Sequence, residues 1–443
     1  MTTVVIEAIA LMPPTPPESM TVTTEQPTPT PDISAHYRAL TSGERAAGPR
    51  GTIMFCVSTA DLSEGKGDLY VAAGLASALS AEGWGVIFWP AERWNEEPPV
   101  ATDVAVVMIE SFVPGLLPPS TATIAWVRNW TASWAKLPYL TEFDGVWASS
   151  GLASEHLEAR FGRPVPIVPI GVDEALFVDP GVERDMPIVT TANFWGVERR
   201  LRAVLDDLSD THPVVWFGAN GAHLERSPRI DHRDRVDFFE LPEVYGRSQL
   251  VVDDVIDPAA EFGSQNSRIF EALSTGTPVT TNTSSGLAEL GLGDLPVFDD
   301  AHSLRRVVDR FVDPSPEQQH EVAEWTRLVR SRHSYSARAR FVAPLLDGAI
   351  DSARGRSSRS EMLRWITVKQ EELRHASRER DGHLITVRRL EREAEALADT
   401  IGDLQGRLAE TVGPLEELRE LKGSRAYTLL ERYRSVASRA RGR

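Results

Sequence analysis

The sequence predicts an α/β protein with two doubly wound parallel-sheet domains that face each other across a cleft, followed by a helical extension. In the first half, short apolar runs such as residues 52–58 alternate with segments of helical periodicity such as 68–81. Apolar runs without polar alternation are typical of parallel strands that helices cover on both faces. The alternation pauses at residues 168–177 and then begins again, which predicts a second domain of the same class.

The composition indicates a globular protein that does not bind nucleic acid. Hydrophobic residues make up 42% and charged residues 25% of the 443 residues, which excludes collagen-like, wholly disordered and disulfide-scaffold proteins. The net charge of −17 makes overall attraction to nucleic acid unfavourable. With Cys56 as the single cysteine, the chain has no internal disulfide and no cysteine-based metal site.

We expect a cytoplasmic protein, able to lie peripherally on the inner face of the membrane through its C-terminus. No apolar run reaches the roughly 18 residues of a membrane span. The apolar start at residues 1–12 is short, lacks basic residues and contains Glu7, so no signal peptide is predicted. A single thiol in an apolar run also fits a reducing compartment.

Changes in composition divide the chain into five segments. In order, they are a disordered Pro- and Thr-rich leader at 1–50, an N-terminal domain at 51–172, a C-terminal domain at 173–350, a helical coiled coil at 351–421 and a basic amphipathic tail at 422–443. Order is expected to begin near Thr52, because proline and threonine cannot build a core. The two domains join at the proline- and glycine-containing stretch 168–177, which suits a short hinge.

Hydrophobic periodicity predicts the elements of both domains. In the N-terminal domain, the predicted strands are 52–58, 86–89, 104–109, 123–127, 146–148 and 165–168, and the predicted helices are 68–81, 131–140 and 152–161. In the C-terminal domain, the predicted strands are 188–191, 214–217, 236–238, 250–255, 278–281 and 295–298, and the predicted helices are 198–208, 267–274, 303–311 and 317–332.

The C-terminal extension carries two further patterns. A heptad seam predicts a coiled coil that self-associates through 384–412 or a helix that folds back on the body; the seam consists of Leu390, Ala394, Leu397, Ile401, Leu404 and Leu408. Beyond it, residues 422–443 hold seven basic residues and one acid, Glu431, interleaved with apolar residues. Such a tail can lie on anionic lipid, or it is a solvated terminus.

Ligands of doubly wound domains bind at the carboxyl ends of the strands, so the loops there are the candidate sites. The first loop contains Gly65 and Gly67 before a helix, where backbone N–H groups can meet an anion. Tyr70 stands where a dinucleotide fingerprint needs a third glycine, so nicotinamide binding is disfavoured, and an ordinary turn is the alternative. In a second loop, Arg128, Asn129 and Trp130 leave an apolar strand toward the predicted cleft, while Trp134 is expected in the core; the alternative for Arg128 is a surface salt bridge.

The densest pattern lies at residues 261–282. A loop containing Gly263 leads into a helix whose first turn holds Asn266, Ser267 and Arg268. This turn offers free N–H groups, a hydroxyl and a cation to a pyrophosphate. Glu271 lies on the same helix face and can accept two ribose hydroxyls. The alternative is a capped helix with a surface Arg–Glu pair, worth less than ~1 kcal/mol.

At these residues the sequence resembles a known family. The run FEALSTGTPVTTN at 270–282, followed by Gly286 and Glu289, is similar to the nucleotide-binding half of GT-B glycosyltransferases of the "glycosyl transferases group 1" type. Within that type, the sequence resembles family-4-like members near the spore-coat-maturation-like branch, which has an Asn-x-Arg-x-Phe-Glu pattern. The runs LASALSAEGWGV, WASSGLASEHL and PIGVDEALF and the closing His333-Ser-Tyr335 also agree in order. The likeness covers residues 52–346.

The resemblance implies a metal-independent transferase that needs no cofactor and takes a hexosyl or deoxyhexosyl group from a nucleotide sugar to a glycan or lipid-linked acceptor, with retention of configuration. It also implies a part in cell-envelope polysaccharide synthesis. On its pattern, Arg268, Glu271 and Arg128 are the catalytic candidates. The donor would be bound by Gly263, Asn266, Ser267, Arg268, Glu271, Asn193, Arg199, Asn282 and Glu289, and the acceptor side would be formed by Gly67, Asp68, Asn129 and Trp130.

One departure from the family pattern bears on activity. Members of the retaining type usually carry two glutamates eight residues apart, and the residue eight before Glu271 is Gly263. Two other functions therefore stay open at this point. One is a non-catalytic nucleotide-sugar or glycan-binding protein on the same fold. The other is an assembly protein whose coiled coil is its function.

Overall fold

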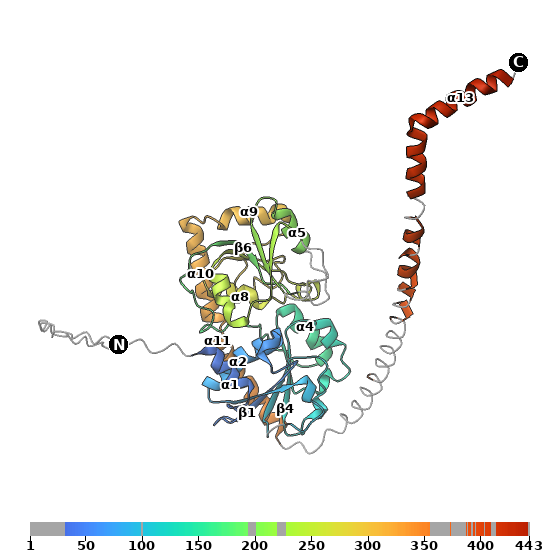
Figure 1. Ribbon diagram of the computed structural model, residues 1–443. Helices are drawn as coiled ribbons and strands as arrows, with labels where there is room; N and C mark the ends of the chain where they lie inside the picture. Colours follow the sequence, from blue (N-terminus) through green and yellow to red (C-terminus); the bar gives the residue numbers. More distant parts are fainter. Residues whose placement is uncertain are drawn as a thin grey trace, which may run out of the picture. The chain divides into compact units, whose positions relative to one another are not determined.

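The computed structural model describes two parts of the chain separately. It covers residues 32–98, 101–193, 201–218 and 227–354 of the α/β body. In the C-terminal extension it covers residues 396–402, 404–408 and 413–441, with isolated helical residues between 373 and 394. Figure 1 shows the body as two sheets with helices around each.

The N-terminal sheet is wholly parallel, with strand order β2-β1-β3-β4-β5. Its strands are β1 (Thr52–Val57), β2 (Gly85–Pro90), β3 (Val104–Val107), β4 (Ala122–Val127) and β5 (Gly145–Ala148). Nearly every strand residue is buried, as the unalternating apolar runs predict. Residues 165–168, predicted as a sixth strand, contribute only a bridge between Ile167 and Ala148.

The C-terminal sheet is also parallel, with strand order β10-β9-β6-β7-β8. Its strands are β6 (Met186–Thr190), β7 (Val214–Phe217), β8 (Ile230–Arg233), β9 (Ser248–Val252) and β10 (Val279–Thr280). The strand predicted at 236–238 is wrong, because the edge strand is the more polar β8. Residues 295–298 form one bridge, Val297 to Thr281, rather than a strand.

Helices cover both sheets. In the N-terminal domain they are α2 (Gly67–Ala81), α3 (Thr131–Ala135) and α4 (Gly151–Phe161). In the C-terminal domain they are α5 (Leu201–Leu208), α6 (Leu241–Gly246), α7 (Asp257–Ala260), α8 (Ser267–Ser274), α9 (Ala301–Phe311) and α10 (Pro316–Arg332). Short 3-10 helices are η1 (Leu62–Glu64), η2 (Ala91–Arg93), η3 (Pro114–Leu116), η4 (Leu140–Glu142) and η5 (Phe238–Glu240). The helix predicted at 131–140 ends at Ala135, three residues before the helix-breaking Pro138.

Order begins before Thr52, which corrects the predicted extent of the leader. Helix α1 (Ile33–Thr41) follows Asp32, whose side chain caps the helix by accepting from the Ala35 N–H group. Tyr37 and Leu40 are buried where α1 packs against α2 and β2. These two buried side chains therefore hold α1 against the domain. The proline-rich composition of the leader gave no sign of this helix. Residues 1–31 lie outside the described residues.

Helix α11 (Tyr335–Ala353) carries the chain back to the N-terminal domain. It packs against α2 and β4, although it follows the last helix of the C-terminal domain. Gly74 of α2 makes room for it, since a Cβ at this glycine would lie 2.2 Å from Cε2 of Tyr335. The predicted boundary at 350 therefore misplaces this helix, because only tertiary packing shows which sheet it covers.

The C-terminal extension is helical where it is described, and includes α13 (Arg425–Arg441). Part of the predicted coiled coil at 384–412 lies outside the described residues, namely 384–386, 388, 391, 392, 395, 403 and 409–412. The seam residues Leu390, Leu397, Ile401, Leu404 and Leu408 are exposed. In the described part of the chain, no helix combines the length and apolarity needed to span a membrane.

Candidate active site

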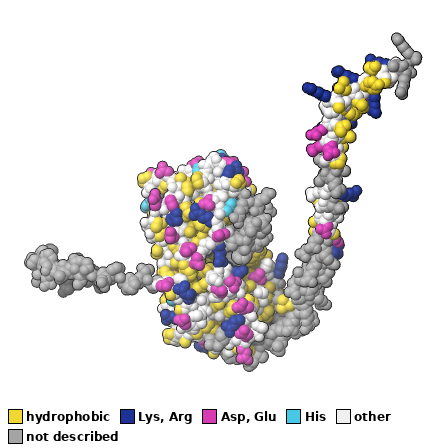
Figure 2. All heavy atoms as spheres, in the orientation of Figure 1, with side chains coloured by type: hydrophobic (Ala, Val, Ile, Leu, Met, Phe, Trp, Pro, Cys, Tyr) yellow, Lys and Arg dark blue, Asp and Glu magenta, His cyan; other side chains and the backbone are white. Residues whose placement is uncertain are grey.

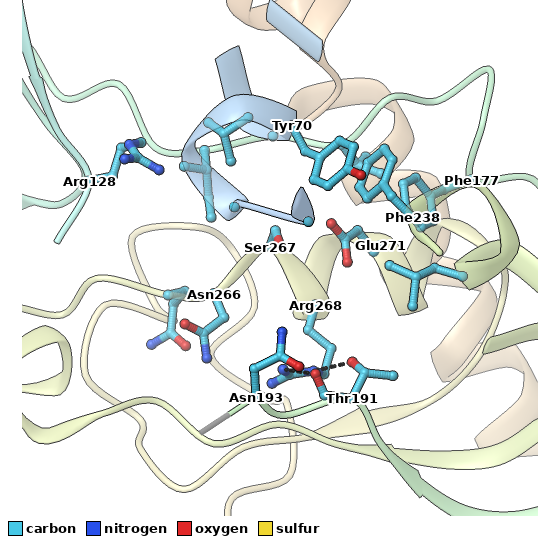
Figure 3. Close-up of a pocket in the computed structure, with 18 of the residues that line it drawn as sticks. Tyr70, Arg128, Phe177, Thr191, Asn193, Phe238, Asn266, Ser267, Arg268 and Glu271 are labelled. Carbon is cyan, nitrogen blue, oxygen red and sulfur yellow. Dashed lines mark hydrogen bonds between the residues drawn. The ribbon is translucent and has the colours of Figure 1, made fainter. Parts of the chain in front are cut away.

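A cavity of about 500 Å³ lies where the carboxyl ends of both sheets meet. In the C-terminal sheet, the strand order reverses between β6 and β9, and open α/β sheets bind ligands at such a reversal. Thr191 and Asn193 follow β6 there, and Asp254 follows β9. Helix α8 forms one wall, as Figure 3 shows.

Helix α8 begins and ends at the predicted residues, and its first turn faces the cavity. Asn266 occupies the N-cap position, but its side chain does not cap the helix. It donates instead to the Asp253 carboxylate at 3.0 and 3.2 Å and to the Asp254 carbonyl at 3.1 Å. Ser267 lines the cavity beside the N–H groups of this first turn. The first turn is therefore a candidate anion site with partial positive charge.

Arg268 does not present an uncommitted cation to the cavity, contrary to expectation. Its side chain is 12% exposed and ion-paired with Asp253, which is fully buried. Nε donates to Thr191 Oγ1 at 2.8 Å and Nη2 to the Thr191 carbonyl at 3.0 Å (Figure 3). Burial lowers the pKa of Arg268, but the surrounding acidic groups, with Asp253 the strongest of them, together raise it above its ordinary value. The guanidinium is therefore held by Asp253 and Thr191 at the cavity wall, because a buried carboxylate needs a countercharge.

Glu271, the predicted ribose contact, brings a buried carboxyl group to the cavity wall. Only 7% of the residue is exposed, and burial raises its pKa to about 7. The Tyr245 hydroxyl donates to its Oε2 at 3.4 Å. Figure 3 places Glu271 and Ser267 on the side of α8 that faces Tyr70 and Phe238. A carboxyl group with this pKa changes its charge near neutral pH.

The N-terminal domain supplies the opposite wall. Gly67, Arg128, Asn129 and Trp130 all line the cavity, as expected from the first and second loops. Trp130 adopts a φ of 55° and remains 37% exposed. By contrast, Asp68 holds the first loop in place by accepting from the Ser58 N–H group at 2.7 Å and the Ser58 hydroxyl at 2.8 Å.

Arg128 is the least satisfied cation of this wall. Nη2 donates to the Met108 carbonyl at 3.1 Å, but the buried Nε has no hydrogen-bond partner among the described residues. Burial lowers the pKa of Arg128, and the nearby Asp68 carboxylate counteracts this. A buried N–H donor without a partner favours binding of an acceptor there.

Three predicted donor residues lie elsewhere. Gly263 has a φ of 71°, and a Cβ there would lie 3.2 Å from the backbone of Gly286, so it shapes a turn. Asn282 bonds to the Val255 backbone and to Asp254. Glu289 accepts from the Gly151 N–H group at 2.9 Å and so ties the two domains together. Arg199 lies outside the described residues, while Asn193 lines the cavity.

Several lining residues escaped the sequence analysis. Tyr70 stacks on Phe238 with ring centroids 3.9 Å apart, which joins the two domains and forms an aromatic wall with Phe177 (Figure 3). Asp253, which does not line the cavity but pairs with Arg268, had a signal in the run VVDD, where two acids follow an apolar strand. The aromatic wall had no such signal, because its residues come from three distant segments.

Hydrogen bonds join the two domains at two places beside the cavity, through the lining residues Arg235 and Ser264. Arg235 donates to the Ser63 and Glu64 carbonyls, each at 2.6 Å. At the second place, the hydroxyls of Ser149 and Ser264 are 2.6 Å apart. The described residues include no cluster of three or more His, Cys, Asp or Glu side chains suited to holding a metal ion.

Comparisons with known proteins place this geometry in a family context. Residues 198–343 match the model of a family described as glycosyl transferase-like, and this stretch contains α8. No curated protein sequence matches the chain.

Among solved structures, the chain is similar to sucrose-phosphate synthase from Thermosynechococcus elongatus, at 13% identity and a TM-score of 0.50 over 68% of this chain and 99% of that one. It is also similar to AviGT4, a glycosyltransferase involved in avilamycin A biosynthesis, at 16% identity and a TM-score of 0.49 over 68% of this chain and 98% of that one. A third is the N-terminal domain of trehalose-6-phosphate phosphatase from Candida albicans, at 11% identity and a TM-score of 0.48 over 67% of this chain and 96% of that one. At 13% identity, the likeness to sucrose-phosphate synthase concerns the fold.

Proposed function

We propose that this chain, whose residues 198–343 match a glycosyl transferase-like family and whose body has the GT-B fold, is a glycosyltransferase. In this proposal it transfers a hexosyl or deoxyhexosyl group from a nucleotide sugar to a glycan or lipid-linked acceptor. The observation that carries the proposal is the cavity between the domains. It sets Ser267 and Glu271 of one domain opposite Arg128 and Asn129 of the other. A donor held by the first pair would present its sugar to an acceptor held by the second.

Glu271 is proposed to bind the ribose of the donor. An ionised carboxylate can accept hydrogen bonds from both ribose hydroxyls, and bonds to a charged acceptor are the stronger ones. Tyr245 supports the group by donating to one carboxylate oxygen. The apolar wall that includes Phe238 lies beside this position and suits the flat face of a nucleobase.

The leaving diphosphate is proposed to lie at the N-terminus of α8. When the anomeric C–O bond breaks, the diphosphate keeps the bonding electrons and gains charge, which prepositioned donors stabilise. Those donors are the first-turn N–H groups, the Ser267 hydroxyl and Arg128 from across the cavity. Arg268 acts indirectly, by pairing with Asp253 and so fixing the first turn. Metal independence and retention of configuration are part of the same proposal.

Gln265 is proposed to contact the donor sugar. The family's upstream acid is replaced by Gly263, which is turned into a loop contact with Gly286. Two residues later, Gln265 lines the cavity, and its Oε1 has no hydrogen-bond partner among the described residues. An amide oxygen can accept from a sugar hydroxyl, though it lacks the charge of the missing glutamate.

A panel of nucleoside diphosphates, measured by thermal shift, tests the donor site. A ligand at about 100 times its dissociation constant should stabilise the protein by about 2.7 kcal/mol. Glu271→Gln should abolish most of the shift, and Glu289→Gln, outside the cavity, should leave it intact. Equal shifts for both variants would place the nucleotide elsewhere.

Gly263 stands where the family usually has a second glutamate, and this also favours a second candidate function. In it, the protein binds nucleotide sugars without transferring them. Incubation with nucleotide sugars separates the two. A glycosyltransferase should slowly hydrolyse its donor even without an acceptor, and Glu271→Gln should suppress this turnover. Saturable binding with no hydrolysis and no transfer to any glycan or lipid-linked acceptor would establish the binding protein instead.

A further inference from the structure

Helix α13 carries one continuous apolar face. Successive helical residues are about 100° apart, so six apolar side chains fall within a sector of about 120°, while Tyr427 lies outside it. These side chains are Ala426, Leu429, Leu430, Tyr433, Val436 and Ala437. All but the half-buried Ala437 are exposed, with 66% of Leu429 and 75% of Tyr433 accessible. Figure 2 shows hydrophobic side chains gathered along this part of the chain.

Arginines border this face on both sides. On the same helical projection, Arg425, Arg432 and Arg439 lie along one margin, and Arg434 lies along the other. Glu431, the single acid between residues 425 and 441, lies on the opposite side of the helix. This arrangement is unusual in a chain whose net charge is −17.

We propose that α13 binds an anionic lipid surface, with its helix axis in the plane of the headgroups. An apolar sector can enter the boundary of the acyl chains while arginines on both margins meet the phosphates. Tyr433, at the centre of the face, is a residue type that favours this boundary. A second copy of the chain is the weaker candidate, because pairing two such faces would bring arginine margins together. The proposal is independent of the donor site.

Co-sedimentation of the full chain with lipid vesicles tests this surface. Wild type should bind vesicles that contain an anionic lipid, bind neutral vesicles at least tenfold more weakly, and lose binding at high salt. A chain ending at Leu421 should not bind either vesicle. Glu271→Gln in the cavity should bind vesicles like wild type, which separates this surface from the donor site.

Point variants locate the contact on the helix. Leu429→Gln with Tyr433→Gln removes apolar side chains from the face, and Ser435→Gln with Ser438→Gln makes a matched change on the polar side. The first pair should weaken binding at least tenfold, and the second should leave it unchanged. Equal binding by both, or by the chain ending at Leu421, would overturn the proposal. So would self-association that the first pair abolishes in a protein that binds no vesicles, because the face would then join two copies.

Discussion

At Glu271, burial works against ionisation, and this has a consequence for stability. The pKa is raised from 4.5 to about 7 in the folded protein, so the folded state keeps a proton that the unfolded chain has already lost. Between these two values stability therefore falls as pH rises. The shift corresponds to about 3 kcal/mol, an order-of-magnitude figure.

We predict that Glu271→Gln gains stability relative to wild type as the pH rises. The variant has no proton to lose, so its advantage should grow by about 3 kcal/mol between about pH 4.5 and pH 7.5. Urea unfolding of both proteins across this range measures the difference. Parallel stability curves would show that the carboxyl group titrates alike in the folded and unfolded chains.

Ribose binding should show the opposite dependence on pH. If the ionised carboxylate accepts both hydroxyls, affinity for a nucleoside diphosphate should rise as the pH passes through 7, and its 2′-deoxy analogue should gain less. Titration calorimetry at several pH values compares the two ligands. Identical pH profiles for both would remove Glu271 from the ribose contact.

The two arginines of the site should separate in their effects. Arg268→Ala leaves Asp253 buried without its countercharge, which costs about 3–5 kcal/mol of stability, and adding Asp253→Asn should recover part of that loss.

Arg128→Gln should instead weaken nucleoside diphosphate binding about tenfold or more, with little effect on the bare nucleoside. Urea unfolding measures the stability of Arg268→Ala, of Arg268→Ala with Asp253→Asn, and of Arg128→Gln, and titration calorimetry measures their affinity for the nucleoside diphosphate. If Arg268→Ala leaves stability intact but weakens diphosphate binding, the two roles are reversed.

At the scale of elements, the crossing of α2 and α11 depends on a missing side chain. Gly74→Ala would place a Cβ 2.2 Å from the ring of Tyr335, which is itself buried. We predict a loss of about 1–3 kcal/mol from this overpacking. Gly348→Ala in α11 is the matched control, because nothing lies within 4 Å of its added Cβ. It should be neutral or gain up to ~1 kcal/mol from helix propensity. Equal unfolding free energies for the two variants would contradict this packing.

Local signals explain which elements were predictable. Helix α8 is predicted to the residue, because Asn266 can begin a helix and Gly276 with Pro278 must end one. Strand β8 was missed because its sequence IDHR is polar at an exposed sheet edge, where apolar periodicity fades. Helix α1 was missed because it is stabilised mainly by two buried side chains, and the proline-rich stretch before it predicts disorder. The pairing of Arg268 could not be predicted, because its partner Asp253 lies on a different element, at the end of strand β9.

At the scale of the whole molecule, the groups proposed to stabilise the charge of the leaving diphosphate come from both domains. The α8 N-terminus and Arg128 lie on opposite walls of one cavity. Turnover should therefore survive a chelator, because these groups would handle the leaving diphosphate without a metal. Donor hydrolysis with and without EDTA measures this. Complete loss of turnover, restored by a divalent cation, would show that a metal is required.

Where the chain crosses between domains also decides how the protein can be recombined. Val172 and Tyr335 meet at the crossing, where the Tyr335 N–H group donates to the Val172 carbonyl at 2.9 Å. The stretch between them is thus an insert whose two ends lie side by side, and α11 belongs to the module outside it. A chimera built to exchange donor preference should replace residues 173–334 as an internal cassette. A single junction after residue 172 would discard α11 and leave the apolar surfaces of α2 and β4 uncovered.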